Sequence, residues 1–373
     1  MSSERTGLQL QSQVNADGTL KVSLVTVEAP APRPHEVVVR IEAAPLNPSD
    51  LGLLLAGADP QALAQPEPNV ITGRVPDAAL RTLSARLGLG MPVGNEGAGV
   101  VVEAGAQAQG LLGKRVALLG GATYSQLRTV AAQQCAVLPD EASFADGAAA
   151  FVNPLTALSM LEVMRREGHT ALVHTAAASN LGQMLQRLCG QEGVGLVNVV
   201  RRPEQVELLR GLGAQHVVSS SSPAFLKELI AAVDATSATL AFDAVGGGKL
   251  ASQLLTAMEA VLSSRMKEYS RYGSHTHKQV YIYGMLDRSP TELTRSYGLQ
   301  WSVGGWLVTP FLQRLGEQRT GELKARVMRE LTTTFKSHYA GELSFAEALT
   351  PQAMARFSAT ATGQKYLLAP NRR

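Results

Sequence analysis

The sequence predicts an α/β fold in which a small β-barrel precedes a doubly wound parallel sheet. About the first 140 residues are rich in short β-type runs that glycines interrupt, which is typical of a small, partly open barrel. From residue 145 onward, helical and strand patterns alternate, as they do in a parallel sheet covered by helices. Residues 171–202 have the order strand, small-residue turn, helix and strand, which is the first half of a dinucleotide-binding unit.

The β-rich part begins with a predicted hairpin, because residues 8–13 and 19–26 have β-type patterns on either side of the turn sequence NADG. Further strands are predicted at residues 36–42 (EVVVRIE), 99–104 and 114–119.

A long excursion, residues 56–91, interrupts these strands. Its first part (ADPQALAQPEPN) is predicted to be a loop. Its second part, residues 76–87, is predicted to be a helix with proline at the first position, Gly88 at its end and an apolar face of leucines. The excursion is either a lid over an active site or a structural decoration or oligomer contact.

The second part of the chain predicts alternating elements. Helices are expected at residues 156–166, 181–191, 203–211, 223–233, 249–269 and 322–335. Strands are expected at residues 171–174, 196–200, 216–218, 240–244 and 280–283, and a terminal KYLL strand returns to the first domain. The expected domains are residues 1–153 with 313–373, and residues 154–312.

Composition excludes several classes of protein. The net charge of +3 over 373 residues is small and scattered, which argues against nucleic acid and membrane partners. No apolar run is long enough to span a bilayer, and residues 1–10 lack the apolar core of a signal peptide, so a cytoplasmic protein is expected. Cys135 and Cys189 lie far apart, so neither a disulfide nor a zinc site is expected. His275 and His277 alternate, but no third metal ligand is near them in the sequence.

The small-residue turn keeps only part of the G-x-G-x-x-G pattern. Its three places are Ala177, Ser179 and Gly182, and the last glycine lets the helix pack closely on the strand. Ala177 and Ser179 are small enough to let a pyrophosphate approach the helix start, and Ser179 and Asn180 offer side-chain hydrogen bonds to phosphate. The alternative is an ordinary strand-to-helix turn in which Ser179 or Asn180 caps the helix.

Two arginines stand where an NAD site has a carboxylate, about 20 residues beyond the turn. The guanidinium groups of Arg201 and Arg202 match the 2′-phosphate of NADP(H), and no acidic residue directly precedes them. The cofactor indicated is therefore NADP(H). A solvated arginine pair at a helix start is the alternative.

Six motifs occur in a fixed order along the chain: PLNPSD (45–50), GNEGAGVV (94–101), FVNPLTA (151–157), AASNLGQ (177–183), NVVRRPEQ (198–205) and GGWL (304–307). Together they resemble the medium-chain dehydrogenase/reductase superfamily, and most closely its zinc-free NADPH:quinone oxidoreductases. The 2-enoyl thioester reductases of the same superfamily are also similar. The resemblance implies a GroES-like barrel domain, a Rossmann domain and a homodimer.

The resemblance also assigns residues. Asn47 matches the asparagine beside the nicotinamide ribose, with a turn residue before proline as the alternative. Asn153 and Thr156 match residues that line the cofactor cleft, although Thr156 could instead be a helix-start cap. Lys365 matches a C-terminal lysine, here assigned to the cofactor site. The backbone that holds the nicotinamide carboxamide matches Gly304, Gly305, Trp306 and Leu307.

Departures from the superfamily narrow the chemistry. Pro48 stands near the place of a zinc-binding cysteine, and Asn95 replaces the zinc-binding histidine, so no metal is expected. The two familiar tyrosine positions hold Gly52 and Ala58. Tyr124 is a substitute proton donor, or a strand residue with its hydroxyl at the surface.

The expected function is NADPH-dependent hydride transfer to a quinone or a similar conjugated carbonyl such as an enone. A quinone is already a strong electrophile, so no dedicated acid is needed. The alternatives are a 2-enoyl thioester reductase, which needs a placed proton donor, and a non-catalytic NADPH-binding redox sensor.

Overall fold

The computed structural model describes residues 5–359 and 362–372 and divides the chain into two compact units. Unit 1 combines residues 1–152 with residues 325–373, and unit 2 is the continuous segment 153–324. The sequence predicted the first boundary after residue 153 and the second after residue 312, whereas the structure places them after residues 152 and 324.

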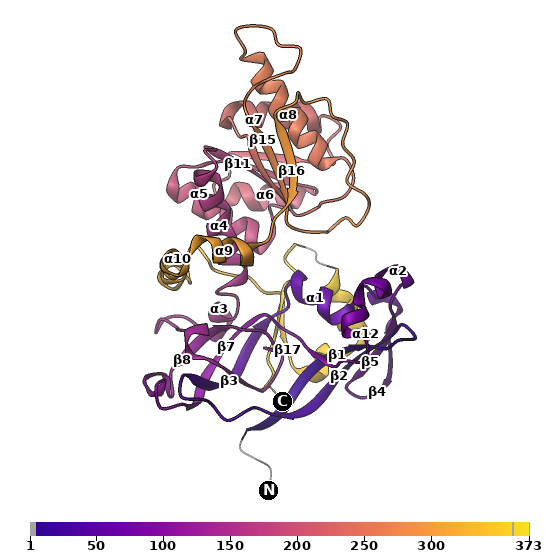
Figure 1. The fold of residues 1–373 in the computed structure, drawn as a ribbon, viewed down its shortest axis with the longest axis vertical. Helices are drawn as coiled ribbons and strands as arrows, with labels where there is room; N and C mark the ends of the chain where they lie inside the picture. The colour runs from indigo at the N-terminus through magenta and orange to yellow at the C-terminus, as the bar shows by residue number, and fades with distance from the viewer. Residues whose placement is uncertain (1–4, 360–361, 373) are drawn as a thin grey trace. The chain divides into compact units, whose positions relative to one another are not determined.

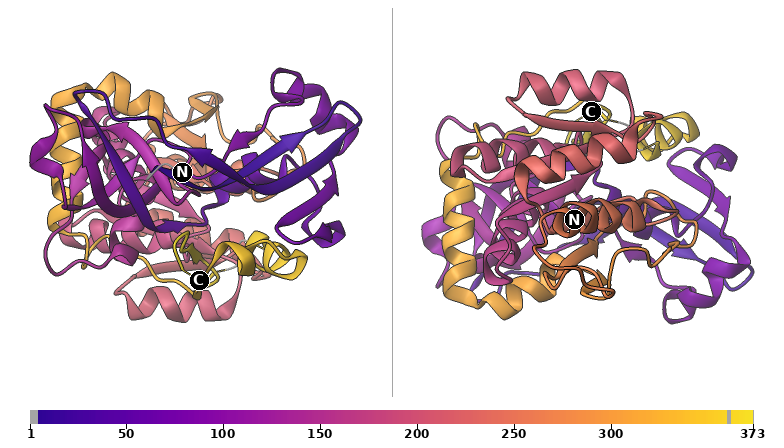
Figure 2. Two further views of the ribbon diagram at one scale, coloured as in Figure 1. Left: turned by 90° about the horizontal axis from the view of Figure 1, so that it is seen from below. Right: turned by 90° about the horizontal axis from the view of Figure 1, so that it is seen from above.

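Unit 1 begins with the hairpin that the NADG turn predicted. Strands β1 (Thr6–Val14) and β2 (Thr19–Glu28) pair antiparallel along their whole length, and the long pair is drawn in indigo in Figure 2. Gly18 has a φ of 83°, a left-handed conformation that favours glycine in a tight turn.

The excursion after residue 55 is built into this first sheet, so the predicted loop is wrong in part. Strands β4 (Ala64–Glu67) and β5 (Val70–Arg74) form a second hairpin, and β5 pairs with β2. The predicted helix is also shorter: α2 (Asp77–Leu80) passes into the 3₁₀ helix η2 (Arg81–Arg86), and Gly88 follows with a φ of 75°. With β6 (Met91–Pro92), the strand order is β4-β5-β2-β1-β6.

Packing favours the interpretation of the excursion as a structural decoration. Leu80, Leu83 and Leu87 pack against the core of unit 1, which confirms the predicted apolar face. The Arg86 guanidinium donates to the carbonyls of Leu53 (3.2 Å) and Ser12 (3.3 Å). Both the apolar face and the arginine therefore tie this segment to the body of unit 1.

The second sheet of unit 1 gathers strands from both ends of the chain. Its order is β10-β8-β7-β3-β18-β17, with β9 also paired to β3. The strands are β3 (Glu36–Pro45), β7 (Glu96–Ala104), β8 (Arg115–Leu119), β9 (Leu127–Ala131), β10 (Cys135–Val137), β17 (Gly341–Leu343) and β18 (Tyr366–Leu368). The KYLL strand does return to unit 1, since Leu367 and Leu368 pair with Pro45 and Ala44.

Short helices complete unit 1. They are α1 (Pro48–Leu55), α3 (Phe144–Ala148), α11 (Phe345–Ala348) and α12 (Pro351–Ser358). Side chains from both sheets and from α1 and α12 form one apolar core. This arrangement confirms the small barrel that the short strands predicted.

Unit 2 contains a six-stranded, all-parallel sheet in the order β13-β12-β11-β14-β15-β16. Its strands are β11 (Ala171–Thr175), β12 (Gly195–Val200), β13 (His216–Ser219), β14 (Leu240–Asp243), β15 (Lys278–Ile282) and β16 (Trp301–Gly305). The chain runs outward from β11 to β13 and then crosses back to β14, so the sheet is doubly wound, as expected. Ligands of such sheets bind beside the carboxyl ends of the strands where the order reverses, here β11 and β14.

The helices of unit 2 follow the predicted alternation. They are α4 (Val152–Arg166, its first residue assigned to unit 1), α5 (Asn180–Glu192), α6 (Pro203–Gly211), α7 (Phe225–Thr236), α8 (Leu250–Ser264) and α9 (Val308–Leu315). The helix α8 ends five residues before the predicted 269. The helix α10 (Glu317–Arg329), which runs from unit 2 into unit 1, lies earlier than the predicted 322–335.

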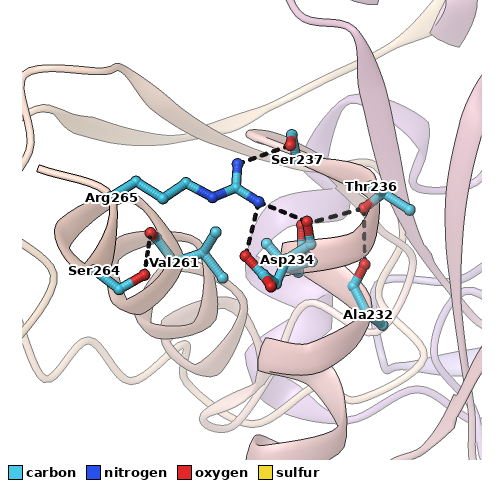
Figure 3. A network of polar contacts seen from close by, with 8 residues as sticks. Ala232, Asp234, Thr236, Ser237, Val261, Ser264 and Arg265 are labelled. Atoms are coloured by element: carbon cyan, nitrogen blue, oxygen red, sulfur yellow. Dashed lines mark hydrogen bonds and ion pairs between the residues drawn. The ribbon is translucent and has the colours of Figure 1, made fainter.

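The helices α7 and α8 run side by side (Figure 1) and pack on Val173 and Val197 of the sheet. Their carboxyl ends are joined by Arg265, which follows α8 (Figure 3). Its guanidinium donates to the backbone carbonyl of Asp234 (2.6 Å), to the Asp234 carboxylate (2.7 Å) and to the Ser237 hydroxyl (2.8 Å). A cation at this position satisfies carbonyls that a helix end leaves unpaired.

A buried ion pair fixes the polar loop after α8. Lys278, at the start of β15, is fully buried and donates to the Glu259 carboxylate on α8. The same carboxylate accepts hydrogen bonds from the Ser274 backbone N–H (2.8 Å) and the Ser263 hydroxyl (2.7 Å). Glu259 therefore connects α8, the loop and β15.

We expect Lys278→Met to lower the free energy of unfolding by about 3–5 kcal/mol, because the Glu259 charge is then buried without its partner. The double variant Lys278→Met/Glu259→Leu should recover much of that loss. Urea unfolding measures both, with the exposed Lys267→Met as the control. If Lys278→Met were as stable as the parent protein, the ion pair would not stabilise the fold as expected.

Candidate functional site

The turn after β11 joins the strand to α5 of unit 2 through small residues. Ala176 has a φ of 51°, and the Ala177 N–H donates to the Val199 carbonyl (3.2 Å). Ser179 is the N-cap of α5, and its hydroxyl accepts from the Gly182 N–H (3.2 Å). Ser179 therefore caps the helix, as the alternative described. The small side chains of the turn do not cover the start of this thirteen-residue helix, which lies at the carboxyl edge of the sheet.

Gly182 is required by close packing. A Cβ atom at this position would lie 2.1 Å from the carbonyl oxygen of Ala177, well inside van der Waals contact. The backbone of α5 therefore approaches the turn as closely as the third glycine of the dinucleotide-binding pattern allows. Asn180, the first residue of α5, is half-buried beside this turn.

The two arginines lie between β12 and α6, and both are exposed. Their backbone is held firmly: the N–H groups of Arg201 and Arg202 each donate to the Gln205 side chain (2.9 Å), and the hydroxyls of Ser219 and Ser221 donate to the Arg201 carbonyl. Among the residues that the structure describes, neither guanidinium has an acidic partner. Both charges are available to a ligand.

A polar contact that the sequence analysis missed joins the strands at the reversal point. The Thr175 hydroxyl, at the end of β11, donates to the Asp243 carboxylate at the end of β14 (2.6 Å). Asp243 also accepts from the N–H groups of Val245 (2.9 Å) and Gly246 (3.1 Å). An acidic residue that ends a predicted strand and precedes glycines, FDAVGG, was the available signal.

Residues 305–307 of the GGWL segment line a cavity of about 810 Å³ in unit 2. Gly304 and Gly305 end β16, a strand that the sequence analysis did not predict, and the Trp306 N–H donates to the Ile282 carbonyl (2.8 Å). The Trp306 ring packs edge-on against Phe242, with ring centroids 5.2 Å apart. Leu307 is the N-cap residue that precedes α9, and it is 63% exposed.

Asn153 and Thr156 both lie in the first part of α4, and Thr156 is buried. The helix begins at Val152, so Thr156 is its fifth residue. Thr156 is therefore not a helix-start cap, because a cap precedes the first helical turn.

Unit 1 contains a buried polar cluster, which we define as Asn47, Asp50, Glu96, Tyr124 and Lys365. Asn47 is the N-cap of α1, and its N–H donates to the Asp50 carboxylate (3.0 Å). The Asn47 side-chain amide donates to Glu96 (2.9 Å). Asn47 thus serves as the turn residue that the alternative described and also carries a side-chain contact in the cluster.

Glu96 is held by three hydrogen-bond donors, although it is only 1% exposed. One oxygen accepts from Asn47, and the other accepts from the N–H groups of Phe151 and Val152 (2.9 Å each). Burial raises the pKa of Glu96, while Lys365 and these hydrogen bonds act in the opposite direction.

Tyr124 is fully buried, so the alternative of a strand residue with its hydroxyl at the surface is wrong. It lies in a bend before β9, and its hydroxyl is 2.9 Å from the Pro45 carbonyl and 3.0 Å from the Asp50 carboxylate. Burial, and then the Asp50 charge, raise the pKa of Tyr124 well above its usual value.

Lys365 brings the only cation of the cluster. Its Nζ is buried, lies 5.6 Å from the centre of the Tyr339 ring and makes no hydrogen bond to any described residue. Burial lowers the pKa of Lys365 to about 8, against the pull of Glu96 and Asp50. The charges of two carboxyl groups of unit 1, Glu96 and Asp50, thus act on the lysine assigned to the cofactor.

The described residues contain no group of three or more His, Cys, Asp or Glu side chains arranged to hold a metal ion. The Asn95 amide donates to the Ser49 hydroxyl (3.3 Å), and His277 lies 3.0 Å from the Ser302 hydroxyl. Cys135 and Cys189 are both free thiols. No described helix is long and apolar enough to cross a membrane.

Comparison with known proteins gives relatives of two kinds, although no family model matches the chain. A quinone oxidoreductase from Pseudomonas aeruginosa is 31% identical over 164 residues, which cover 43% of this chain and 50% of that protein. A mitochondrial enoyl-acyl-carrier-protein reductase from Xenopus tropicalis is 31% identical over 205 residues, which cover 52% and 51%. The chain therefore spans about half the length of these relatives.

The fold comparison covers the whole chain. The structure of a protein from Mesorhizobium loti, named as an NADPH:quinone reductase, matches with a TM-score of 0.73 and 26% identity over 99% of this chain and 100% of that one. The expected combination of a barrel unit and a doubly wound unit is thereby confirmed. In fold and in sequence the chain resembles the quinone oxidoreductases and enoyl reductases, as its motifs indicated.

Proposed function

We propose that this protein is an NADPH-dependent oxidoreductase that reduces a quinone or a similar conjugated carbonyl compound without a metal. The observation that carries the proposal is the turn of unit 2, where Gly182 lets α5 approach the end of β11 and two arginines follow β12. The resemblance to quinone oxidoreductases supports the same conclusion.

The residues present fit NADP(H). The N-terminus of α5 offers backbone N–H groups to a pyrophosphate beside the small side chains of Ala177 and Ser179. Arg201 and Arg202 offer two exposed guanidinium groups to a 2′-phosphate. We assign the nicotinamide to the backbone of residues 304–307. When bound, the cofactor supplies the hydride, and the protein binds and orients it.

A second candidate, reduction of an enoyl thioester, is favoured by one observation in unit 1. Such a reaction needs a proton donor at a defined place, and the Tyr124 hydroxyl is held between Pro45 and Asp50. The similarity to an enoyl reductase supports this candidate. A quinone remains the preferred substrate class, because its reduction does not require a proton donor at a defined place in the protein.

We further propose a cytoplasmic homodimer. The resemblance to the superfamily supports this state, and light scattering coupled to size exclusion measures it. A mass near 79 kDa, about twice the 39.5 kDa chain, is the expected outcome. A mass of one chain at all concentrations would contradict it.

The double variant Arg201→Ala/Arg202→Ala should raise the dissociation constant of NADPH about 30-fold or more, because two charge-assisted contacts to the 2′-phosphate are lost. The dissociation constant of NADH should change less than threefold. Fluorescence titration of both cofactors measures the difference, and the exposed Arg210→Ala is the matched control. If the affinities for NADPH and NADH fell equally, the assignment of the two arginines to the 2′-phosphate would be contradicted.

Turnover separates an enzyme from a non-catalytic sensor. We expect NADPH to be oxidised in the presence of a quinone, with slower oxidation of NADH, and the nicotinamide absorbance measures both. Activity confined to an enoyl thioester would favour the second candidate. Tight NADPH binding without oxidation by any quinone, enone or enoyl thioester would favour the sensor.

A further inference from the structure

The charges of the buried cluster in unit 1 do not balance when every group is ionised. Two carboxyl groups, Asp50 and Glu96, share one cation, Lys365, and both carboxyl groups are at most 2% exposed. With all three ionised, a net negative charge is buried, which is costly. One bound proton makes the cluster neutral.

Hydrogen bonds identify the carboxyl group that holds this proton. Glu96 accepts three N–H donors, which stabilise a carboxylate. Asp50 accepts one N–H, from Asn47, and its other oxygen has no partner among the described residues. The excess proton therefore belongs on Asp50.

Proton counting at Tyr124 leads to the same group. Its hydroxyl lies within hydrogen-bond distance of two oxygens, from Pro45 and Asp50, but carries one proton. If that proton is donated to the Pro45 carbonyl, the contact with Asp50 is a hydrogen bond only when Asp50 carries a proton. A neutral Asp50 thus satisfies both contacts.

We propose that Asp50 holds a proton at neutral pH and shares it with Tyr124, with the charge of Lys365 controlling its release. The proposal concerns unit 1 alone and goes beyond the proposed function, because it makes the buried cluster a pH-sensitive group of the barrel unit.

The charged groups around Asp50 are consistent with this role. Burial raises the pKa of Asp50 to about 7, and the charge of Glu96 acts in the same direction, while the hydrogen bond from the Asn47 N–H and the charge of Lys365 oppose it. Arg86 contacts the Leu53 carbonyl at the other end of α1.

The first test needs no substrate. Carbon-13 NMR of the aspartate carboxyl groups, assigned with Asp50→Asn, should show one group in the folded protein that titrates near pH 7. Lys365→Met should move that titration upward by about one unit, because the cation that favours the carboxylate is lost. The exposed Asp140→Asn is the matched control and leaves the signal in place. Complete titration of the Asp50 signal below pH 5 would overturn the proposal.

Stability gives a second readout. Between pH 4 and 7 the folded protein keeps the Asp50 proton, whereas the unfolded chain, with a pKa near 3.8, releases it. The unfolded state binds fewer protons, so the free energy of unfolding falls as the pH rises through this range. Asp50→Asn imitates the neutral carboxyl group and should flatten that slope. An unchanged slope in the variant would show that Asp50 is a carboxylate in the folded protein and would overturn the proposal.

Discussion

The close contact between α5 and the end of β11 is the constraint on which the nucleotide unit depends. Because no side chain fits at Gly182, the helix backbone approaches the turn, and the first turn of α5 reaches the carboxyl edge of the sheet. The contact between Thr175 and Asp243 then joins the two strands where the chain order reverses. Together these two contacts place fixed polar groups at the edge where parallel sheets bind ligands.

The two units solve the problem of buried charge in different ways. In unit 2, Lys278 and Glu259 form a direct ion pair with further hydrogen bonds, so both charges are compensated. In unit 1, Lys365 makes no direct hydrogen bond to the described residues and faces two carboxyl groups. The ion pair of unit 2 is suited to holding a loop in place, whereas the cluster of unit 1 contains one proton that can be released.

Local sequence patterns predicted most helices and strands, but they failed where tertiary contacts determine whether an element forms or where it ends. The strand β4 was missed because all four of its residues are exposed and one is Pro66, so no alternation marks it. The helix α8 ends at Ser264, where the side chain of the next residue, Arg265, binds the end of α7, a contact that the local pattern does not reveal. The turn and the two arginines could be found from spacing, but the surroundings of Tyr124 and Lys365 could not, since residues far apart in the sequence create them.

Unit 1 is assembled from segments on both sides of unit 2, and this has a consequence for synthesis on the ribosome. Residues 153–324 emerge as one continuous piece and can fold while translation continues. The edge of β3 that pairs with β18 stays uncovered until residues 366–368 have emerged, and Lys365 arrives with them. The nascent chain therefore carries Asp50 and Glu96 without their cation through most of translation, and the barrel closes at the same time as its charge is balanced.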